Sequence, residues 1–289
     1  MGSGDGVDVS ITLLTRNAGP LLARVLRAIR SQETQRSVEI VAVDSGSSDG
    51  TLAVLAQFDV NVAQISADSF DFGLTRDHVF EMARGEIVIA LSQDAVPAHP
   101  GWLEALVAPL AEPSVAASCG RSIPHPERDM PQFIWERNGY FYFTREMRAF
   151  FKKYGRGLSN ANAAIRRSVW ERLRFGRQPI GEDFRFQTKL NAEGLQIAFP
   201  DGAETLHHHA YTLPSLYKRC RNEGLGLRTL GCAYSELDLV RDLLRFDVHR
   251  AWLRESLHGN LRWPSDWVFP VLRPCAVYAG SRFARGFLR

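Results

Sequence analysis

Three groups of acidic and imidazole side chains in this sequence could support metal or acid–base chemistry. They are Asp94 in "SQDA", the pair Glu182 and Asp183 in "GED", and the triplet His207, His208 and His209. A hard divalent cation prefers carboxylate and diphosphate oxygens, and an imidazole can complete its ligand set. Taken together, Asp94 and the histidines suggest a metal site that would neutralise the charge developing on a leaving diphosphate.

Each group also has a simpler explanation. Asp94 can form the turn after a buried strand, and a histidine triplet can be a solvated loop. Acids at a helix start commonly cap the N-terminus and meet the helix dipole favourably, which local sequence favours for Glu182 and Asp183. The same position would lower the pKa of a catalytic base and keep it ionised at pH 7. Local residues alone leave these alternatives open.

Other nucleotide and hydrolase motifs are missing. The first strand–helix turn reads "TRNAGPLL", without the G-x-G-x-x-G of a dinucleotide site. The chain has no G-x-x-x-x-G-K-[ST], no G-x-S-x-G and no H-E-x-x-H. Hydride transfer, P-loop chemistry, α/β-hydrolase chemistry and zinc proteolysis are therefore disfavoured.

Alternating strands and helices would position the acids. Apolar, β-branched runs predict strands at 9–15, 38–45, 61–66 and 86–92, with helices at 21–32 and 51–58 between them. This pattern indicates an α/β fold, a mostly parallel sheet with helices on both faces. Ligands bind beyond the carboxyl ends of such strands. We therefore expect the polar tips that begin at Thr15, Asp44 and Ser92 to lie along one edge.

The second half of the chain is more helical. A helical pattern runs through 158–175, another helix starts in 180–194, and 196–200 could be a late strand. The end, from 234 to 289, is helical in tendency and carries Trp252, Trp263 and Trp267 among many arginines. Such a segment could meet anionic lipid, although tryptophan more often packs in a core.

Composition limits the classes of function. The 289 residues are 45% hydrophobic and 23% charged, with a net charge of +3, so no nucleic-acid partner is expected. The four cysteines are scattered, which fits a reducing compartment. Neither a signal peptide nor an apolar run of about 20 residues is evident. We expect a cytoplasmic protein, with peripheral contact at the inner face of the membrane still open.

Several motifs in order resemble those of one known family. They are "ITLLTRN", "VDSGSSDGT", "FGLTRD", "ARGEIVIALSQDAVP", "GRSIP", "NANAAIRRSVW", "GEDF" and "HHHAYT…YKRCRNEG". This set is similar to the family 2 inverting glycosyltransferases, above all to the rhamnosyltransferases that build bacterial surface polysaccharides. The resemblance spans about 9–231, which is most of the chain.

The resemblance implies a GT-A fold and assigns roles to particular residues. It implies a GT-A domain at 1–233, with a nucleotide-sugar half at about 7–120 and an acceptor half at about 121–233, followed by a helical segment at 234–289. Asp183 matches the general base, while Asp94 matches the metal ligand, joined by His207 or, as a fallback, His209. The matched donor-binding residues are Thr15, Arg16, Asp44, Ser45, Ser47, Arg76, Gln93, Asp94 and Arg219. The matched acceptor-side or supporting residues are Glu182, Arg121 and Trp170.

The function implied by the resemblance is metal-dependent sugar transfer with inversion. The donor would be dTDP-L-rhamnose, the cofactor Mg²⁺ or Mn²⁺, and the acceptor a surface glycan or a glycan on a lipid carrier. Two alternatives remain: transfer of another hexose from a UDP- or GDP-sugar, and a catalytically silent module that binds nucleotide sugars.

Overall fold

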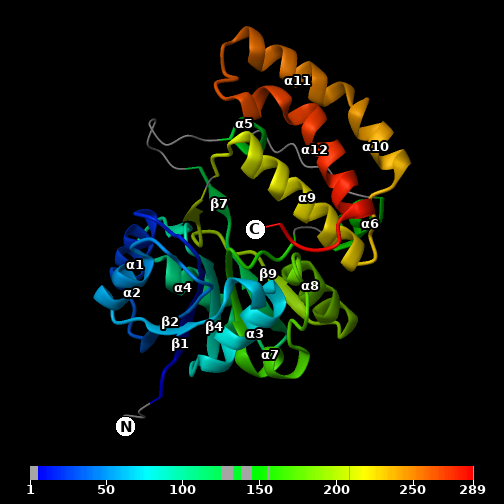
Figure 1. The fold of residues 1–289 in the computed structure, drawn as a ribbon. Helices are drawn as coiled ribbons and strands as arrows, with labels where there is room; N and C mark the ends of the chain where they lie inside the picture. Colours follow the sequence, from blue (N-terminus) through cyan, green and yellow to red (C-terminus); the bar gives the residue numbers. More distant parts are fainter. Residues whose placement is uncertain (1–5, 125–132, 138–144, 155–156, 208, 289) are drawn as a thin grey trace. The chain divides into compact units, whose positions relative to one another are not determined.

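The computed structural model describes residues 6–124, 133–137, 145–154, 157–207 and 209–288, which form two compact units (Figure 1). The first unit comprises Met1–Ile123, Leu158–Gln178 and Glu182–His207, and the second comprises Pro124–Gly157, Pro179–Gly181 and His208–Arg289, each within the described ranges. The predicted boundary after residue 233 lies within the second unit.

A seven-stranded sheet in the order β3-β2-β1-β4-β8-β6-β9 forms the centre of the first unit. Its strands are β1 (Val9–Thr15), β2 (Val38–Asp44), β3 (Asn61–Gln64), β4 (Ile87–Ser92), β6 (Val115–Cys119), β8 (Asn162–Arg166) and β9 (Gln196–Ala198). All neighbouring pairs are parallel except the two that β8 makes with β4 and β6. The predicted mostly parallel sheet is confirmed.

Helices cover both faces of this sheet, because the side chains of each strand alternate between two apolar cores. In β4, Ile89 and Leu91 enter one core while Val88 and Ala90 enter the other. One core takes residues of α1 (Leu21–Arg30), α2 (Thr51–Gln57) and α4 (Trp102–Val107). The opposite core takes residues of α3 (Phe72–Met82), α7 (Arg167–Leu173) and α8 (Glu182–Ala192). Two 3₁₀ turns, η1 (Ala67–Ser69) and η2 (Ala108–Ala111), complete the first unit's helical elements.

The helical pattern expected over 158–175 is wrong in its first part. Residues 162–166 form β8, an antiparallel strand in the middle of the sheet, and the helix begins only at Arg167. The alanines of "NAAIR" suit a helix by intrinsic propensity. Burial between β4 and β6 overrides that preference, since Asn162, Ala163, Ala164 and Ile165 are all fully enclosed.

A second, three-stranded sheet lies in the same unit, in the order β5-β10-β7. It consists of β5 (Val96–Pro97), β7 (Ser122–Ile123) and β10 (Thr205–Leu206). Leu206 pairs with Val96 in an antiparallel register, and the amide of His207 donates to the carbonyl of Ile123 (3.0 Å). This small sheet therefore brings the chain after β10 beside the turn before β5.

The second unit is helical, as predicted for the C-terminal segment. It contains α5 (Ile134–Arg137), α6 (Arg145–Tyr154), α9 (Leu213–Thr229), α10 (Glu236–Leu243), α11 (Phe246–Leu257) and α12 (Pro264–Phe283). α12 packs closely against α9, because a methyl group at Gly224 would overlap the carbonyl of Val277 and one at Gly280 the carbonyl of Arg221. Across the described residues, no helix combines the length and the apolar character needed to cross a membrane.

Candidate functional site

Polar side chains from the carboxyl ends of β1 and β2 meet around Asp44. Thr15 Oγ1 and Ser47 Oγ donate to Asp44 Oδ2 at 2.8 and 2.6 Å. The amides of Gly46 and Ser47 donate to Oδ1 at 3.1 and 2.8 Å, and the amide of Ser45 donates to the carbonyl of Thr15 at 2.9 Å. Asp44 is fully buried. Its carboxylate therefore shapes the loop after β2, and its predicted contact with a nucleotide base stays a prediction.

The end of β4 is tied to the end of β1 by Gln93. Its side-chain Oε1 accepts from the amide of Arg16 (2.9 Å), and its Nε2 donates to the carbonyl of Arg16 (3.3 Å). The Arg16 side chain stays exposed. The expectation that the three strand tips share one edge is thus confirmed, because contacts link Thr15 to Asp44 and Arg16 to Gln93.

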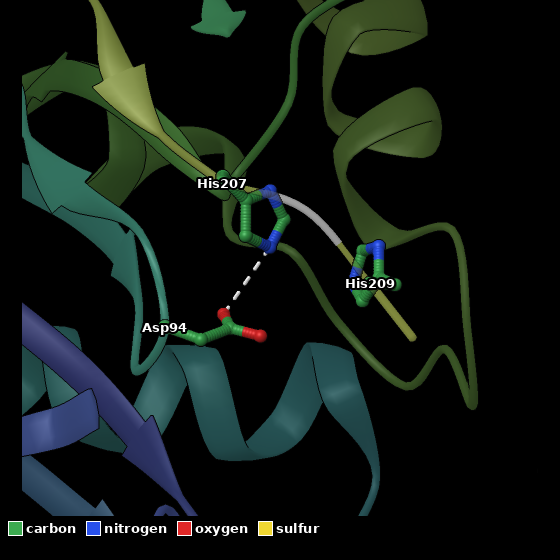
Figure 2. Close-up of side chains that lie close together, drawn as sticks. All are labelled: Asp94, His207 and His209. Atoms are coloured by element: carbon green, nitrogen blue, oxygen red, sulfur yellow. Dashed lines mark ion pairs between the residues drawn. The ribbon is translucent and has the colours of Figure 1, made fainter. Parts of the chain in front are cut away.

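Asp94 and His207 face each other beside the small sheet. Oδ1 of Asp94 lies 3.2 Å from Nε2 of His207, and both side chains are only partly exposed. His209 lies two residues further along the chain, and one ligand atom from each of the three residues lies within 4.8 Å of the others (Figure 2). One carboxylate and two imidazoles suit Mn²⁺ or Mg²⁺ when a diphosphate supplies further oxygens. His208 lies outside the described residues.

Glu182 and Asp183 begin α8, as predicted, and Arg76 of α3 lies close to both. Glu182 Oε1 accepts from Asn160 Nδ2 at 3.0 Å and lies 3.5 Å from Arg76 Nη2. Arg76 is 5% exposed, and its Nε and Nη1 have no hydrogen-bond partner among the described residues. A buried ion pair of this kind stands beside the predicted base.

Burial, together with the neighbouring charge of Glu182, raises the pKa of the Asp183 carboxyl to about 7. The amide of Phe184 and the charge of Arg76 act in the opposite direction. The expected lowering of this pKa by the helix start is therefore wrong, because loss of solvent outweighs the helix N-terminus. A carboxyl that titrates near neutral pH is well suited to accept a proton from a substrate.

The Asp94 turn and the Asp183 cluster are connected through the ends of β4 and β8. The amide of Ser92 donates to the carbonyl of Ala161 (3.1 Å), next to the Asn160 that holds Glu182. The same strand pairing sets Leu91 opposite Asn162. The two acidic groups are thus positioned by neighbouring segments of one sheet.

The remaining predicted residues lie elsewhere. Arg121 is exposed, and its Nη2 lies 3.3 Å from Glu204. Trp170 is buried in the core, where its Nε1 donates to Asp77 Oδ1 (2.8 Å). Arg219 is exposed on α9 of the second unit.

Sequence reasoning missed two side chains that organise this region. Asn160 holds Glu182, and Asp77 accepts from Trp170 and from the amides of Phe175 and Gly176 (both 2.9 Å). The sequence does mark Asn160 as a candidate, since it lies in "SNAN", a polar cluster before an apolar run. Nothing in the local sequence indicates that the side chain of Asp77 points into the core.

The family model described as "Glycosyl transferase family 2" matches residues 10–174, which include the strand tips and the Asp94 turn. The chain belongs to this family. It is therefore a glycosyltransferase, an enzyme that transfers a hexose.

Two curated relatives are similar over most of the chain. The O-antigen chain rhamnosyltransferase RfbN of Salmonella typhimurium is 31% identical over 227 residues, which cover 75% of this chain and 71% of that protein. The O-antigen chain rhamnosyltransferase WbaN of Salmonella anatum is 30% identical over 229 residues, with the same two coverages.

Solved structures show the same fold at lower identity. A Pyrobaculum calidifontis mannosyltransferase, in complex with GDP-Man and Mn²⁺, gives a TM-score of 0.61 at 18% identity, covering 96% of this chain and 86% of that one. A second match is glucosyl-3-phosphoglycerate synthase of Mycobacterium tuberculosis, in complex with Mn²⁺, UDP and glucosyl-3-phosphoglycerate. It gives a TM-score of 0.59 at 18% identity, covering 78% of this chain and 79% of that one. The predicted GT-A fold is confirmed.

Proposed function

We propose that this protein is a metal-dependent inverting glycosyltransferase that moves L-rhamnose from dTDP-L-rhamnose to a hydroxyl of a surface glycan or of a glycan on a lipid carrier. The observation that carries the proposal is Asp183, a buried carboxyl whose pKa is raised to about 7, near the end of β4. Rhamnose is the sugar named in both curated relatives.

In the proposed reaction, Asp183 accepts the proton of the acceptor hydroxyl as its oxygen attacks the anomeric carbon. The new bond forms on one face of the sugar while the bond to the diphosphate breaks on the other, and dTDP leaves with the electron pair. The transition state resembles an oxocarbenium ion. Glu182, held by Asn160 and Arg76, keeps its own carboxylate fixed beside the base.

Asp94, His207 and His209 would hold the divalent cation, since their ligand atoms cluster within 4.8 Å. When bound, the ion would neutralise charge on the departing diphosphate. Thr15, Arg16, Ser45, Ser47 and Gln93 would line the nucleotide pocket around the loop that Asp44 shapes. The predicted donor contacts of Arg76 and Arg219, and the acceptor-side roles of Arg121 and Trp170, are part of the same proposal.

A UDP- or GDP-hexose donor is the second candidate, because the two solved structures contain GDP-Man and UDP. Thermal shift with dTDP-L-rhamnose, UDP-glucose and GDP-mannose, each with and without Mn²⁺, separates the donors. A metal-dependent shift confined to dTDP-L-rhamnose is expected. A larger shift with either other sugar would reassign the donor, and no shift with any would contradict the proposal.

Turnover distinguishes an enzyme from a silent binding module. We expect slow, metal-dependent hydrolysis of the donor without acceptor, and transfer with inversion when acceptor is present. Asp183→Asn should keep the thermal shift with donor but lose transfer by about 10²–10⁴-fold. Asp201→Asn, at an exposed acid, is the matched control and should behave as wild type. Full transfer by Asp183→Asn would remove the base from the mechanism.

A further inference from the structure

The helices α10 and α11 expose apolar side chains in regular rows. Leu237, Val240 and Leu244 recur at a spacing of three and four residues on and just after α10, as do Phe246, Arg250, Leu253 and Leu257 on α11. Leu237 is 81% exposed, and Phe246 and Leu257 are 77% exposed. We call the six apolar residues of these rows the outer stripe.

The outer stripe faces away from the second unit's own core. α10 and α11 both pack on α12, and in the ribbon they follow one another along its outer side (Figure 1). On α11 the buried side chains are Val248, Ala251 and Glu255, which lie on the face opposite the stripe. Folding of this unit therefore leaves the stripe uncovered.

On α10 two acids are buried more deeply than any of the helix's apolar residues. Its buried residues are the acids Asp238 and Asp242, Leu239 and Leu243 are partly buried, and Leu237 and Val240 face solvent. Both buried carboxylates accept hydrogen bonds, since Tyr234 Oη donates to Asp242 (2.6 Å) and Ser235 Oγ donates to Asp238 (2.8 Å). A surface helix normally turns its apolar side inward. Exposed apolar rows of this kind mark a surface that binds a partner or a membrane.

The charges of residues 234–289 favour an anionic lipid surface over a second copy. Arg250 lies within the α11 row, and its side chain has no partner among the described residues, which is also true of Arg262 and Arg285. Residues 234–289 contain nine arginines, no lysine and six acids. A second copy would bring unpaired arginines together, whereas anionic headgroups would neutralise them. Trp263 and Trp267, both about half exposed, are typical of a membrane–water interface.

We propose that the outer stripe, with Arg250, is a docking surface for a bilayer that contains anionic lipids. The apolar side chains would enter the headgroup boundary, and the arginines would stay with the phosphates. This inference does not depend on the donor, the metal or the base, because docking requires no sugar transfer.

Flotation of the full chain with lipid vesicles tests the proposal. We expect strong binding to vesicles of phosphatidylcholine with phosphatidylglycerol, weak binding to phosphatidylcholine alone, and release at high salt. The triple variant Phe246→Ser/Leu253→Ser/Leu257→Ser should bind at least about tenfold more weakly. Arg250→Glu should lose most of the preference for phosphatidylglycerol.

Matched controls separate docking from misfolding. Leu74→Ser and Arg27→Glu change exposed residues of the first unit and should bind as wild type. All variants should keep the wild-type melting temperature, since the altered side chains are exposed. Wild-type binding by the triple variant would overturn the proposal. The proposal would also be overturned if the wild-type protein bound neither kind of vesicle. Formation of a dimer that the triple variant cannot form would then identify a second copy as the partner of the outer stripe.

Discussion

Nε2 of His207 lies 3.2 Å from Oδ1 of Asp94, although the two residues are far apart in the sequence. The contact follows from the small sheet, where Leu206 of β10 pairs with Val96 of β5. This pairing places His207, which follows β10, beside the turn that contains Asp94 and precedes β5. At this distance, an imidazole nitrogen and a carboxylate oxygen can share a proton or bind one ion. The pair is the most direct support for the proposed metal site.

Loss of either partner should weaken metal binding. Asp94→Asn and His207→Gln are each expected to lower Mn²⁺ affinity in the presence of dTDP by at least about 100-fold, above the usual cost of losing a supporting residue. His209→Gln should have a smaller effect. Titration calorimetry measures the affinities, and His258→Gln, at an exposed histidine of the second unit, is the control. Unchanged Mn²⁺ binding by both Asp94→Asn and His207→Gln would remove this pair from the site.

Transfer should depend on the ionisation of Asp183. A general base acts only as the carboxylate, so with a pKa raised to about 7 the rate should fall as the pH drops below 7 and level off above it. The measurement is kcat against pH at saturating donor and metal. A rate that stays flat down to pH 5 would show that a different group accepts the proton.

The Glu182→Gln variant tests the cause of this shift. The charge of Glu182 helps to raise the pKa of Asp183, so a neutral side chain of the same shape should move the acidic limb of the kcat profile to lower pH. Asn160 could still donate to the glutamine oxygen, which preserves the local geometry. An acidic limb at an unchanged or higher pH would contradict the electrostatic coupling.

The shared edge of Thr15, Asp44 and Gln93 could be predicted from sequence because it depends on local signals. Each follows an apolar run, and the carboxyl ends of parallel strands meet at one edge. The helix start at Glu182 is equally local, since a glycine and two acids mark it. Features of this kind can be predicted from hydrophobic periodicity and from the residues typical of turns.

The structure of 162–166 and the ionisation of Asp183 could not be predicted in this way. Ala163 and Ala164 have helical propensity, and only their burial between two strands makes them part of a sheet. The pKa of Asp183 depends on burial and on the charges of Glu182 and Arg76, the second of which comes from a distant helix. Both properties belong to the packed chain, so no local pattern contains them.

Arg76 should matter for stability as well as for the base. Arg76→Met would leave Glu182 buried without its cation, at a cost of about 3–5 kcal/mol in the free energy of unfolding. The matched control is Arg172→Met, which breaks an exposed pair with Glu193 and should cost less than about 1 kcal/mol. Urea unfolding measures both. Equal losses would mean that burial of the Arg76–Glu182 pair has no consequence for stability.

Arg76→Lys keeps the charge and should retain most of the stability. Its shorter reach should still weaken the opposing effect of this cation on Asp183, and the acidic limb of kcat should then move to higher pH. An unchanged pH profile together with normal folding would make Arg76 a purely structural residue.

The pKa of Asp183 also predicts how stability changes with pH. The folded-state value of about 7 lies above the unfolded value of about 3.9, so the folded protein binds one more proton between these limits. Its contribution to stability is therefore complete below about pH 4 and is lost as the pH rises to about 7. Asp183→Asn cannot lose this proton. It should melt at a higher temperature than wild type at pH 8, with a difference that shrinks toward pH 4, while the exposed control Asp201→Asn shows no such trend. A melting difference that is the same at both pH values would mean that burial of Asp183 does not disfavour its charge.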